Sequence, residues 1–389
     1  MRLALISHGR PDDPRHFSGI PWHVLQELRR QGHVVEACHA EPDSWTRHWA
    51  QFKHRLSLKF SGQPHHFEAD PWILRTRSIS LDKKIRAFAP DAVLCVGFPE
   101  VACALSPSLP LYVWMDAFYQ TVRRNYAYFR DYYSKNDAHR LQQIEDRVLR
   151  RAKKIWLSSK WAADEAEADF PRTAWRIGVQ SFGANLDNPP SSAEVEQFIS
   201  ARDLAAPTFL FLANEWERKG GAAAVETVKH LRGKGIPAKL VVVGLNERPT
   251  TIPPEPWLEW VGRLDKNSSE DNRRLKRYFA DSAFLLLPTT ADCTPIVCLE
   301  AAAYGLPVLS TTVGGLASTV DSGITGMLWP VENFTDEAPN WLKPVLTDRK
   351  RYIEMAHAAR HRYETTGNWM VNVRAVAAEI AKSTQLASA

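Results

Sequence analysis

Short apolar runs alternate along this chain with longer polar stretches that have the character of helices, and this alternation limits the fold more than any other feature. Such a pattern is typical of parallel sheets that are covered by helices on both faces. We therefore predict an α/β protein whose ligands bind at the carboxyl ends of its strands. The predicted strands cover residues 3–7, 92–96, 111–114, 155–158, 208–212, 240–243, 284–287 and 308–310.

Chain length and one linker predict two domains. The chain has 389 residues, which is enough for two α/β domains that each bury a core of their own. Residues 185–192 form a polar segment with two prolines and two serines, which is typical of a linker. We therefore expect an N-terminal domain over residues 1–186 and a C-terminal domain over residues 187–367.

Composition excludes several classes of protein. The five cysteines contain no Cys-x-x-Cys pair, and their odd number favours reduced thiols and a cytoplasmic location. No stretch approaches 18 consecutive apolar residues, so we expect neither a signal peptide nor a membrane-spanning helix. The net charge of +5 is too small to indicate a nucleic-acid partner, and no zinc-finger or RNA-binding motif accompanies it.

The strongest local signal is the segment from Asp292 to Glu300. Asp292 follows the predicted strand 284–287, and Glu300 lies within the helix that the intervening residues begin. The first amide groups of a helix point outward and attract phosphate or sugar oxygens. Two carboxylates around a helix N-terminus therefore suit a ligand that carries both hydroxyl groups and a diphosphate, such as a sugar nucleotide.

This segment resembles the glutamate-x7-glutamate signature of retaining glycosyltransferases of family 4, with Asp292 in place of the first glutamate. Residues 300–308 resemble the E-A-x-x-x-G-x-P-V of that family, and residues 313–326 resemble the glycine-rich segment that follows it. The resemblance implies the GT-B fold, in which two Rossmann-like, doubly wound domains face a central cleft. It also implies that a last helix, over residues 368–389, returns to the N-terminal, acceptor-side domain. An ordinary βαβ unit with acidic residues at its rim is the alternative.

A second segment matches the part of the family that carries its cations. Residues 209–221 resemble a strand, loop and helix in which Arg218 and Lys219 stand at the start of the helix. These cations would stabilise the negative charge on a departing nucleoside diphosphate. The family usually places its arginine five residues before the lysine, where this chain has Asn214. Lys219 therefore keeps the family pattern and Arg218 departs from it.

A third segment, residues 17–24, resembles the glycine-rich opening of the family. Its Gly19 would let the backbone approach the donor diphosphate, because glycine has no Cβ. Ser18 replaces the usual first glycine, and the small size of serine makes this departure tolerable.

The resemblance also implies roles for Asp292, Glu300 and the residues near them. Asp292 would bind hydroxyl groups of the sugar, and Glu300 would bind those of the ribose. Arg263 ends the segment of a further predicted strand and would lie beside the nucleotide base. The remaining predicted substrate-binding residues, at the start of the helix, are Cys293, Thr294, Ile296 and Val297.

One departure from the family lies in the N-terminal domain. Residues 110–116 align with a family strand that ends in His-Asp, whose histidine helps to hold the donor sugar. This chain has Met115 in place of the histidine and keeps Asp116. A thioether cannot act as a charged hydrogen-bond donor. Either Asp116 takes over the contact with the acceptor, or the helix between Asp292 and Glu300 holds the sugar, or turnover has been lost.

Together these features predict a glycosyltransferase that makes a polysaccharide or glycolipid. The resemblance implies retaining transfer of a hexose-type sugar from a nucleoside-diphosphate sugar to a hydroxyl group, with Asp116, Lys219 and Asp292 as catalytic residues. The chain has no Asp-x-Asp pair of the kind that holds a divalent ion on a diphosphate, so we expect no metal and no other cofactor. The alternatives are a noncatalytic sugar-nucleotide binder and a GT-B epimerase or phosphorylase-like enzyme.

A helix in the N-terminal domain leaves two interpretations open. Apolar residues recur at helical spacing over residues 45–60, and the same stretch contains cations but no acidic residue. One interpretation is a helix that lies on the inner face of an anionic membrane and leads to a lipid-linked acceptor. The other is a core helix with a solvated basic face. The apolar residues are Trp45, Trp49, Phe52, Leu56 and Phe60.

Overall fold

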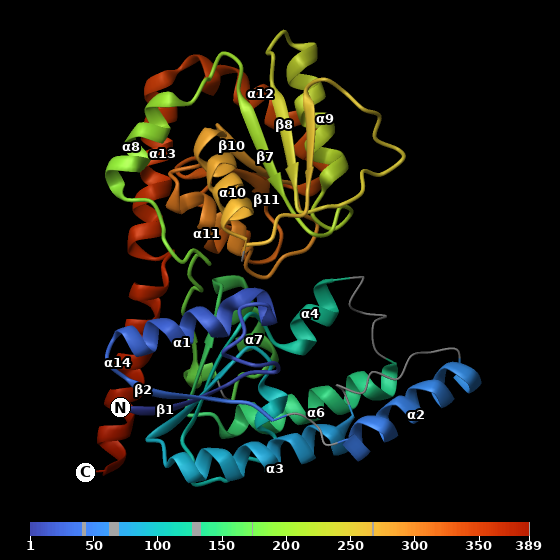
Figure 1. Cartoon of the computed structure of the whole chain (residues 1–389), viewed down its shortest axis with the longest axis vertical. Coiled ribbons are helices and arrows are strands. Elements are labelled where there is room, and N and C mark those ends of the chain that lie inside the picture. Colours follow the sequence, from blue (N-terminus) through green and yellow to red (C-terminus); the bar gives the residue numbers. More distant parts are fainter. Residues whose placement is uncertain (41–43, 62–69, 127–133, 173, 267, 389) are drawn as a thin grey trace. The chain divides into compact units, whose positions relative to one another are not determined.

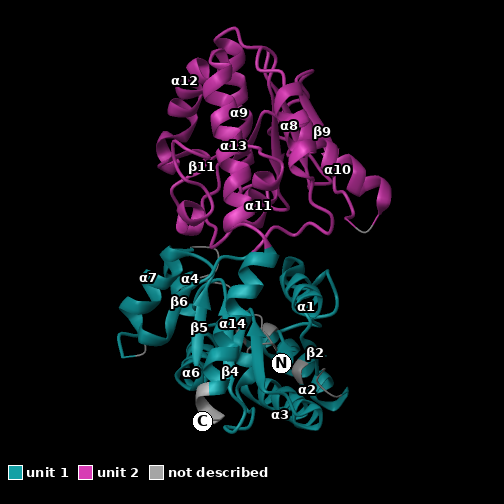
Figure 2. Cartoon of the chain, turned by 90° about the vertical axis from the view of Figure 1, so that its left-hand side faces the viewer, with its two compact units in different colours: residues 1–182, 369–389 teal, residues 183–368 magenta. Residues whose placement is uncertain are grey.

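The chain folds into two compact units, each of which is described by itself. In this computed structural model, residues 1–389 are described except 41–43, 62–69, 127–133, 173, 267 and 389. Unit 1 comprises Met1–Phe182 together with Trp369–Ala389, and unit 2 comprises Gly183–Asn368 (Figure 2). The sequence analysis predicted these boundaries after residues 186 and 367, whereas the two compact units divide after residues 182 and 368.

Unit 1 is built on a sheet of six parallel strands (Figure 1). The spatial order is β2-β1-β3-β4-β5-β6, and the two central strands β3 and β4 are buried along their whole length. Burial on both faces explains why these strands are continuous apolar runs in the sequence. The strands are β1 (Arg2–Ile6), β2 (Val34–Cys38), β3 (Ala92–Val96), β4 (Leu111–Met115), β5 (Lys154–Leu157) and β6 (Ile177–Val179).

Helices cover the sheet of unit 1, and several begin at a side chain that accepts backbone hydrogen bonds. Asp70 accepts from the amides of Trp72 and Ile73, and Pro71 occupies the first helical position, where no amide is needed. The helices are α1 (Ile20–Arg30), α2 (Ser44–Ser61), α3 (Pro71–Phe88), α4 (Tyr119–Asn125), α6 (Lys135–Arg151), α7 (Lys160–Asp169) and α14 (Trp369–Ser388), with short 3-10 turns η1 (His16–Gly19), η3 (Pro99–Ala102) and η4 (Ala174–Arg176).

The last helix, α14, packs onto unit 1. The ring of Trp369 lies 5.7 Å from the ring of Trp114 and 5.9 Å from that of Phe182. The Asn372 side chain accepts a hydrogen bond from Gln180 (2.8 Å) and donates one to the Phe182 carbonyl (3.2 Å). The C-terminal residues are therefore part of the N-terminal core.

Unit 2 repeats the architecture with a second sheet of six parallel strands, in the order β12-β11-β10-β7-β8-β9. Its strands are β7 (Thr208–Leu212), β8 (Lys239–Val243), β9 (Leu258–Gly262), β10 (Phe284–Leu287), β11 (Val308–Thr311) and β12 (Gly326–Trp329). Its helices are α8 (Ser192–Ala201), α9 (Gly221–Gly233), α10 (Ser269–Asp281), α11 (Ile296–Ala303), α12 (Phe334–Thr347) and α13 (Arg349–Thr365), with 3-10 turns η5 (Gly314–Ser318) and η6 (Val331–Asn333).

Two further observations bear on the expected class of protein. Within the described part of the chain, none of the helices combines the length and the apolar character needed to cross a bilayer. All five cysteines lie among the described residues and are free thiols.

Candidate functional site

The order of strands in unit 2 identifies the place where a ligand would bind. The chain runs from β7 through β8 to β9 in one direction and then continues through β10, β11 and β12 in the other. The strand order therefore reverses between β7 and β10, which are hydrogen-bonded neighbours. In open parallel sheets, the crevice at the carboxyl ends of such a pair is where ligands bind. The predicted cations follow β7, and the predicted Asp292 follows β10.

A glycine brings these two loops together. Gly220 has a φ of +76°, and a Cβ at this position would lie 1.9 Å from the carbonyl oxygen of Pro288 in the neighbouring loop. No other residue fits so close an approach. Next to it, the carbonyl of Arg218 accepts hydrogen bonds from the Thr290 amide (2.8 Å) and the Thr289 hydroxyl (3.0 Å). The backbone of the cation-bearing turn is thus fixed by the loop after β10.

The two loops carry an ion pair between Lys219 and Asp292. The Lys219 ammonium donates to Oδ2 of Asp292, and Nη1 of Arg218 lies 4.0 Å from the same oxygen. The Lys219 and Asp292 side chains are only 12% and 11% exposed. The Asp292 carbonyl accepts from the Gly315 amide at 3.1 Å, so the glycine-rich segment after β11 fixes its position. The structure therefore brings three predicted site residues into one cluster.

Arg218 is held by a residue that the sequence analysis did not single out. Its guanidinium donates to both carboxylate oxygens of Glu215, at 2.8 and 2.6 Å, and to the carbonyl of Ala291 at 2.9 Å. The hydrogen bonds from Arg218 lower the pKa of Glu215. Two-point binding of a carboxylate leaves the guanidinium with few donors for a ligand. Lys219 donates directly to Asp292, whereas Arg218 lies 4.0 Å away, so Lys219 is the cation nearer to Asp292.

Glu300 also has a partner that the sequence analysis missed. Glu300 lies on α11 with 3% of its surface exposed, and Nζ of Lys266 donates to its Oε1 at 2.6 Å. Lys266 follows β9, three residues after Arg263. Arg263 itself is exposed, and its backbone amide donates to the Asn246 side chain at 3.3 Å. The need of a buried carboxylate for a cation is the signal that could have indicated such a lysine.

The helix between the two carboxylates begins at a residue that cannot cap it. Pro295 is the N-cap of α11, and its side chain accepts no hydrogen bond from the first amides of the helix. Cys293, Ile296 and Val297 are partly exposed along the first turn, whereas Thr294 is buried. The first amides of α11 are consequently able to bind an anion.

In unit 1, the predicted Gly19 lies in a backbone segment of unusual conformation. Strand order reverses between β1 and β3, and the segment that follows β1 leads into α1. Phe17, Ser18 and Gly19 have consecutive positive φ angles of +46°, +55° and +83°. Two of these residues carry a Cβ, for which this region costs about 1–2 kcal/mol each. Strain of this kind accumulates where the backbone is shaped for a ligand.

Asp116 follows β4 at the same edge of the sheet in unit 1. Its Oδ1 accepts a hydrogen bond from the Ser158 hydroxyl, at 3.0 Å, from the end of β5. Met115, which replaces the family histidine, is 4% exposed at the last position of β4. The structure thus orients the Asp116 carboxylate and buries the thioether.

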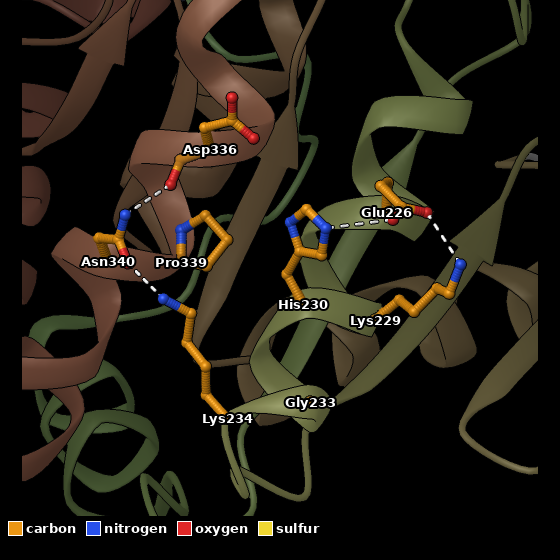
Figure 3. A pocket seen from close by; sticks show the side chains of 8 residues that line it. All are labelled: Glu226, Lys229, His230, Gly233, Lys234, Asp336, Pro339 and Asn340. Atoms are coloured by element: carbon orange, nitrogen blue, oxygen red, sulfur yellow. Dashed lines mark hydrogen bonds and ion pairs between the residues drawn. The ribbon is translucent and has the colours of Figure 1, made fainter.

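A separate groove lies elsewhere in unit 2, between α9 and α12, with a volume of about 710 Å³ (Figure 3). Several of its polar side chains interact with one another. His230 lies 3.2 Å from Glu226, which also pairs with Lys229 at 3.4 Å, and Lys234 donates to Asn340. Because none of the lining residues follows the carboxyl end of a strand, we assign no part of the donor site to this groove.

Comparisons with known proteins relate part of this sequence to glycosyltransferases. Residues 206–347 match the family model of the glycosyl transferases group 1. A D-inositol 3-phosphate glycosyltransferase of Nocardia farcinica is 32% identical over 122 residues, which are 30% of this chain and 24% of the relative. The putative colanic acid biosynthesis glycosyltransferase WcaL of Salmonella typhimurium is 27% identical over 175 residues, 40% of this chain and 42% of the relative. The chain spans about a fifth to a half of the length of the curated relatives that it matches.

Solved structures match the whole chain at low sequence identity. Sucrose-phosphate synthase from Thermosynechococcus elongatus has a TM-score of 0.69 at 15% identity and covers 100% of this chain and 99% of its own. Anabaena Alr3699/HepE, solved in complex with UDP, has a TM-score of 0.65 at 13% identity and covers 98% and 100%. Both are glycosyltransferases of the GT-B fold. Residues 206–347 therefore resemble the glycosyl transferases group 1, and the two six-stranded sheets of the chain have the GT-B fold.

Proposed function

We propose that this protein transfers a hexose-type sugar from a nucleoside-diphosphate sugar to a hydroxyl group of a glycan or glycolipid, with retention of the anomeric configuration. The observation that carries the proposal is the Lys219–Asp292 ion pair where the strand order of unit 2 reverses, close in sequence to the N-terminus of α11. The match of residues 206–347 to the glycosyl transferases group 1 supports it. The complex of Anabaena Alr3699/HepE with UDP-glucose supports a nucleotide sugar as the donor class.

Donor binding would exchange the ion pair for two charge-assisted contacts. In the free protein, Lys219 is neutralised by Asp292. In the complex, the ammonium would bind diphosphate oxygens, while the Asp292 carboxylate would accept hydrogen bonds from hydroxyl groups of the sugar. As the bond to the anomeric carbon lengthens, negative charge accumulates on the diphosphate, and Lys219 and the α11 amides stabilise it.

The remaining residues would position the two substrates. Glu300 would bind the ribose hydroxyls, and the half-exposed Lys266 would balance the charge of this buried carboxylate. The Asp116 carboxylate, oriented by Ser158, would accept a hydrogen bond from the attacking hydroxyl group of the acceptor. That hydroxyl would attack the anomeric carbon from the face that the diphosphate leaves, which retains the configuration, and its proton would pass to the departing diphosphate.

We also propose that the reaction needs no metal ion and no other cofactor. The diphosphate would be neutralised by Lys219, the nearby Arg218 and the α11 amides. The sequence has no Asp-x-Asp pair that would hold a divalent ion in their place. Activity should therefore persist in excess chelator, and an activity that chelator abolishes and Mg²⁺ or Mn²⁺ restores would refute this part of the proposal.

A screen of nucleotide sugars tests the function directly. UDP-, GDP-, ADP- and dTDP-sugars are added to the full chain, and the one that raises the melting temperature most identifies the donor. Release of the nucleoside diphosphate from this donor, with water as the acceptor, then tests catalysis. A melting shift without release would support the noncatalytic binder that Met115 suggests. No shift with any sugar nucleotide would overturn the donor site.

A further inference from the structure

Helix α2 exposes a continuous stripe of large apolar side chains. The stripe consists of Trp45, Trp49, Phe52, Leu56 and Phe60, which are 84%, 47%, 49%, 37% and 78% exposed. A core helix would bury these residues, so the core-helix interpretation of this segment is wrong. Single exposed apolar residues are ordinary, but five along about 22 Å of one helix mark an interaction surface. We call these five residues the aromatic stripe; α2 is the helix labelled at the lower right of Figure 1.

Another side of α2 attaches the helix to unit 1. Thr46 is 1% exposed, and the Lys53 ammonium donates to Oδ2 of Asp70 at 2.7 Å. Asp70 is 2% exposed and also caps α3. At about 100° per residue, Thr46 and Lys53 lie about 60–80° from the centre of the aromatic stripe. The anchoring contacts therefore hold α2 in place and leave the stripe facing outward.

Positive charge flanks the aromatic stripe on its other side. Arg55 and Lys59 are exposed, and helical geometry places them about 60–100° from the centre of the stripe, opposite to Thr46 and Lys53. Residues 45–88 contain nine Lys or Arg and three Asp or Glu, so this segment alone carries a formal charge of +6, against +5 for the whole chain.

The next described helix along the chain, α3, also exposes apolar side chains. It exposes Trp72 (46%) and Ile79 (43%), and Arg75 between them is also exposed. Of the three acidic residues in the segment, Asp70 and Asp82 are buried. Each of the two helices thus exposes at least one aromatic ring and at least one cation.

We propose that α2 docks on an anionic membrane surface, with the aromatic stripe at the level of the lipid headgroups and Arg55 and Lys59 on their phosphates. Aromatic rings flanked by cations, on a helix that does not cross the bilayer, suit this interface. Charge complementarity favours an anionic surface over a neutral one. It disfavours a second copy of this chain, whose equivalent face carries the same charge. The proposal does not rest on the proposed transfer reaction, since none of its residues is assigned to donor binding or catalysis.

Co-sedimentation of the full chain with vesicles tests the proposal. The protein should sediment with vesicles that contain phosphatidylglycerol, much less with pure phosphatidylcholine, and it should be released by about 0.5 M salt, where charge is strongly screened. The variant Trp45→Ser/Phe60→Ser removes the two most exposed members of the stripe and should bind at least tenfold more weakly. The matched control is Trp175→Ser, because Trp175 is also in unit 1 and 71% exposed but lies outside the stripe.

A second variant and two further measurements make the outcome decisive. Arg55→Gln/Lys59→Gln should abolish the preference for phosphatidylglycerol while the melting temperature stays within a degree or so of the parent. The proposal would be overturned if the wild-type protein did not sediment with phosphatidylglycerol vesicles. It would also be overturned if the variant of the aromatic stripe bound them as well as the parent does. A dimer in light scattering that the stripe variant converts to monomer without any vesicle binding would overturn it too, because the stripe would then be a protein interface.

Discussion

At the scale of single residues, a substitution of Lys219 distinguishes the two contributions that a cation in the site can make, which are binding of the donor and stabilisation of the transition state. Its benefit should grow as charge develops on the leaving diphosphate, so Lys219→Ala should lower turnover more than donor affinity. We expect a loss of about 10²–10³-fold in kcat, the usual effect of removing one group that stabilises a developing charge. Steady-state kinetics and donor titration measure the two quantities.

The control for this substitution is Lys229→Ala. Lys229 lies on α9, ten residues after Lys219, its side chain is 66% exposed, and Glu226 is its only ion-pair partner among the described residues. Removing it should leave both kcat and donor affinity unchanged. An effect of Lys219→Ala on KM alone, or equal effects of the two substitutions, would show that Lys219 contributes no more than general positive charge.

A second prediction at this scale concerns Glu145, a buried carboxyl in unit 1. Glu145 lies on α6 with 1% exposure, and both its oxygens accept from the Tyr119 amide, at 3.0 and 3.1 Å, where α4 begins after the Asp116 loop. Burial raises the pKa of Glu145 well above its ordinary value, and the nearby Glu100 raises it further. Burial also raises the pKa of Glu100, against the opposing effect of His8.

The consequence is a loss of stability with rising pH. The native state keeps the Glu145 proton that the unfolded chain loses above its ordinary pKa of about 4.3, so stability is complete below that pH and falls until the raised pKa is passed. Glu145→Gln remains neutral and should raise the urea midpoint at pH 8 more than at pH 5. Glu167→Gln, at an exposed site on α7, should change neither. Equal gains at both pH values would contradict a neutral Glu145.

Not every residue of the candidate site could be predicted from the sequence. Lys219 and Asp292 stand in motifs of their own, so each was predictable without knowledge of the other. Lys266 could not be found in this way, because its role depends on the segment after β9 reaching Glu300, 34 residues further along. Glu215 was missed for a related reason, since an exposed acidic residue near a cation has no distinctive pattern in sequence.

At the scale of elements, the apolar runs predicted the inner strands and passed over the outer ones. All eight predicted runs coincide with strands, and the four strands outside them, β2, β6, β9 and β12, are the edges of the two sheets. An edge strand has one neighbour and meets solvent, so it can be short or partly polar. β6 has three residues, and β2 alternates exposed and buried positions. A search for continuous apolar runs cannot detect such strands.

The turn between β7 and α9 supports a prediction about one element. Gly220→Ala would force a Cβ to within 1.9 Å of the Pro288 oxygen at a φ of +76°, so the two loops of the site must separate. We expect a loss of about 2–4 kcal/mol of stability, from backbone strain and overpacking together. Donor-induced stabilisation should also be lost, since Lys219 is the preceding residue. Chemical unfolding with and without the donor measures both.

A matched glycine-to-alanine substitution at the C-terminal end of α9 should raise the stability of the protein instead of lowering it. Gly233 is the last residue of α9, and a Cβ there would meet no atom within 4 Å. Gly233→Ala should therefore stabilise the protein by up to about 1 kcal/mol through helix propensity, without changing donor binding. If Gly220→Ala proved as harmless as Gly233→Ala, the close approach of the two loops would not be a constraint on the site.

At the scale of the whole molecule, two sheets with separate cores predict two separable units of stability. The sequence indicated two domains through its length and its linker, but it indicated the return of the last helix only through the resemblance. The reason is physical: packing of residues 369–389 on residues 1–182 joins the two ends of the chain, and no local pattern encodes such a contact. Trp369, Val373, Val376 and Ile380 are 6%, 0%, 1% and 0% exposed in this core.

Deletion of residues 369–389 tests this arrangement. Burial of one large apolar side chain contributes about 1.5–3 kcal/mol, so losing four should remove roughly 6–12 kcal/mol, which is comparable to the whole stability of a domain. We expect unit 1 to unfold and become sensitive to protease, while a fragment near residues 183–368 survives digestion and keeps its own calorimetric transition. A donor nucleoside diphosphate should raise the temperature of that transition, because Lys219, Asp292 and Glu300 all lie in unit 2. Loss of both transitions together would show instead that unit 2 depends on unit 1 for its stability.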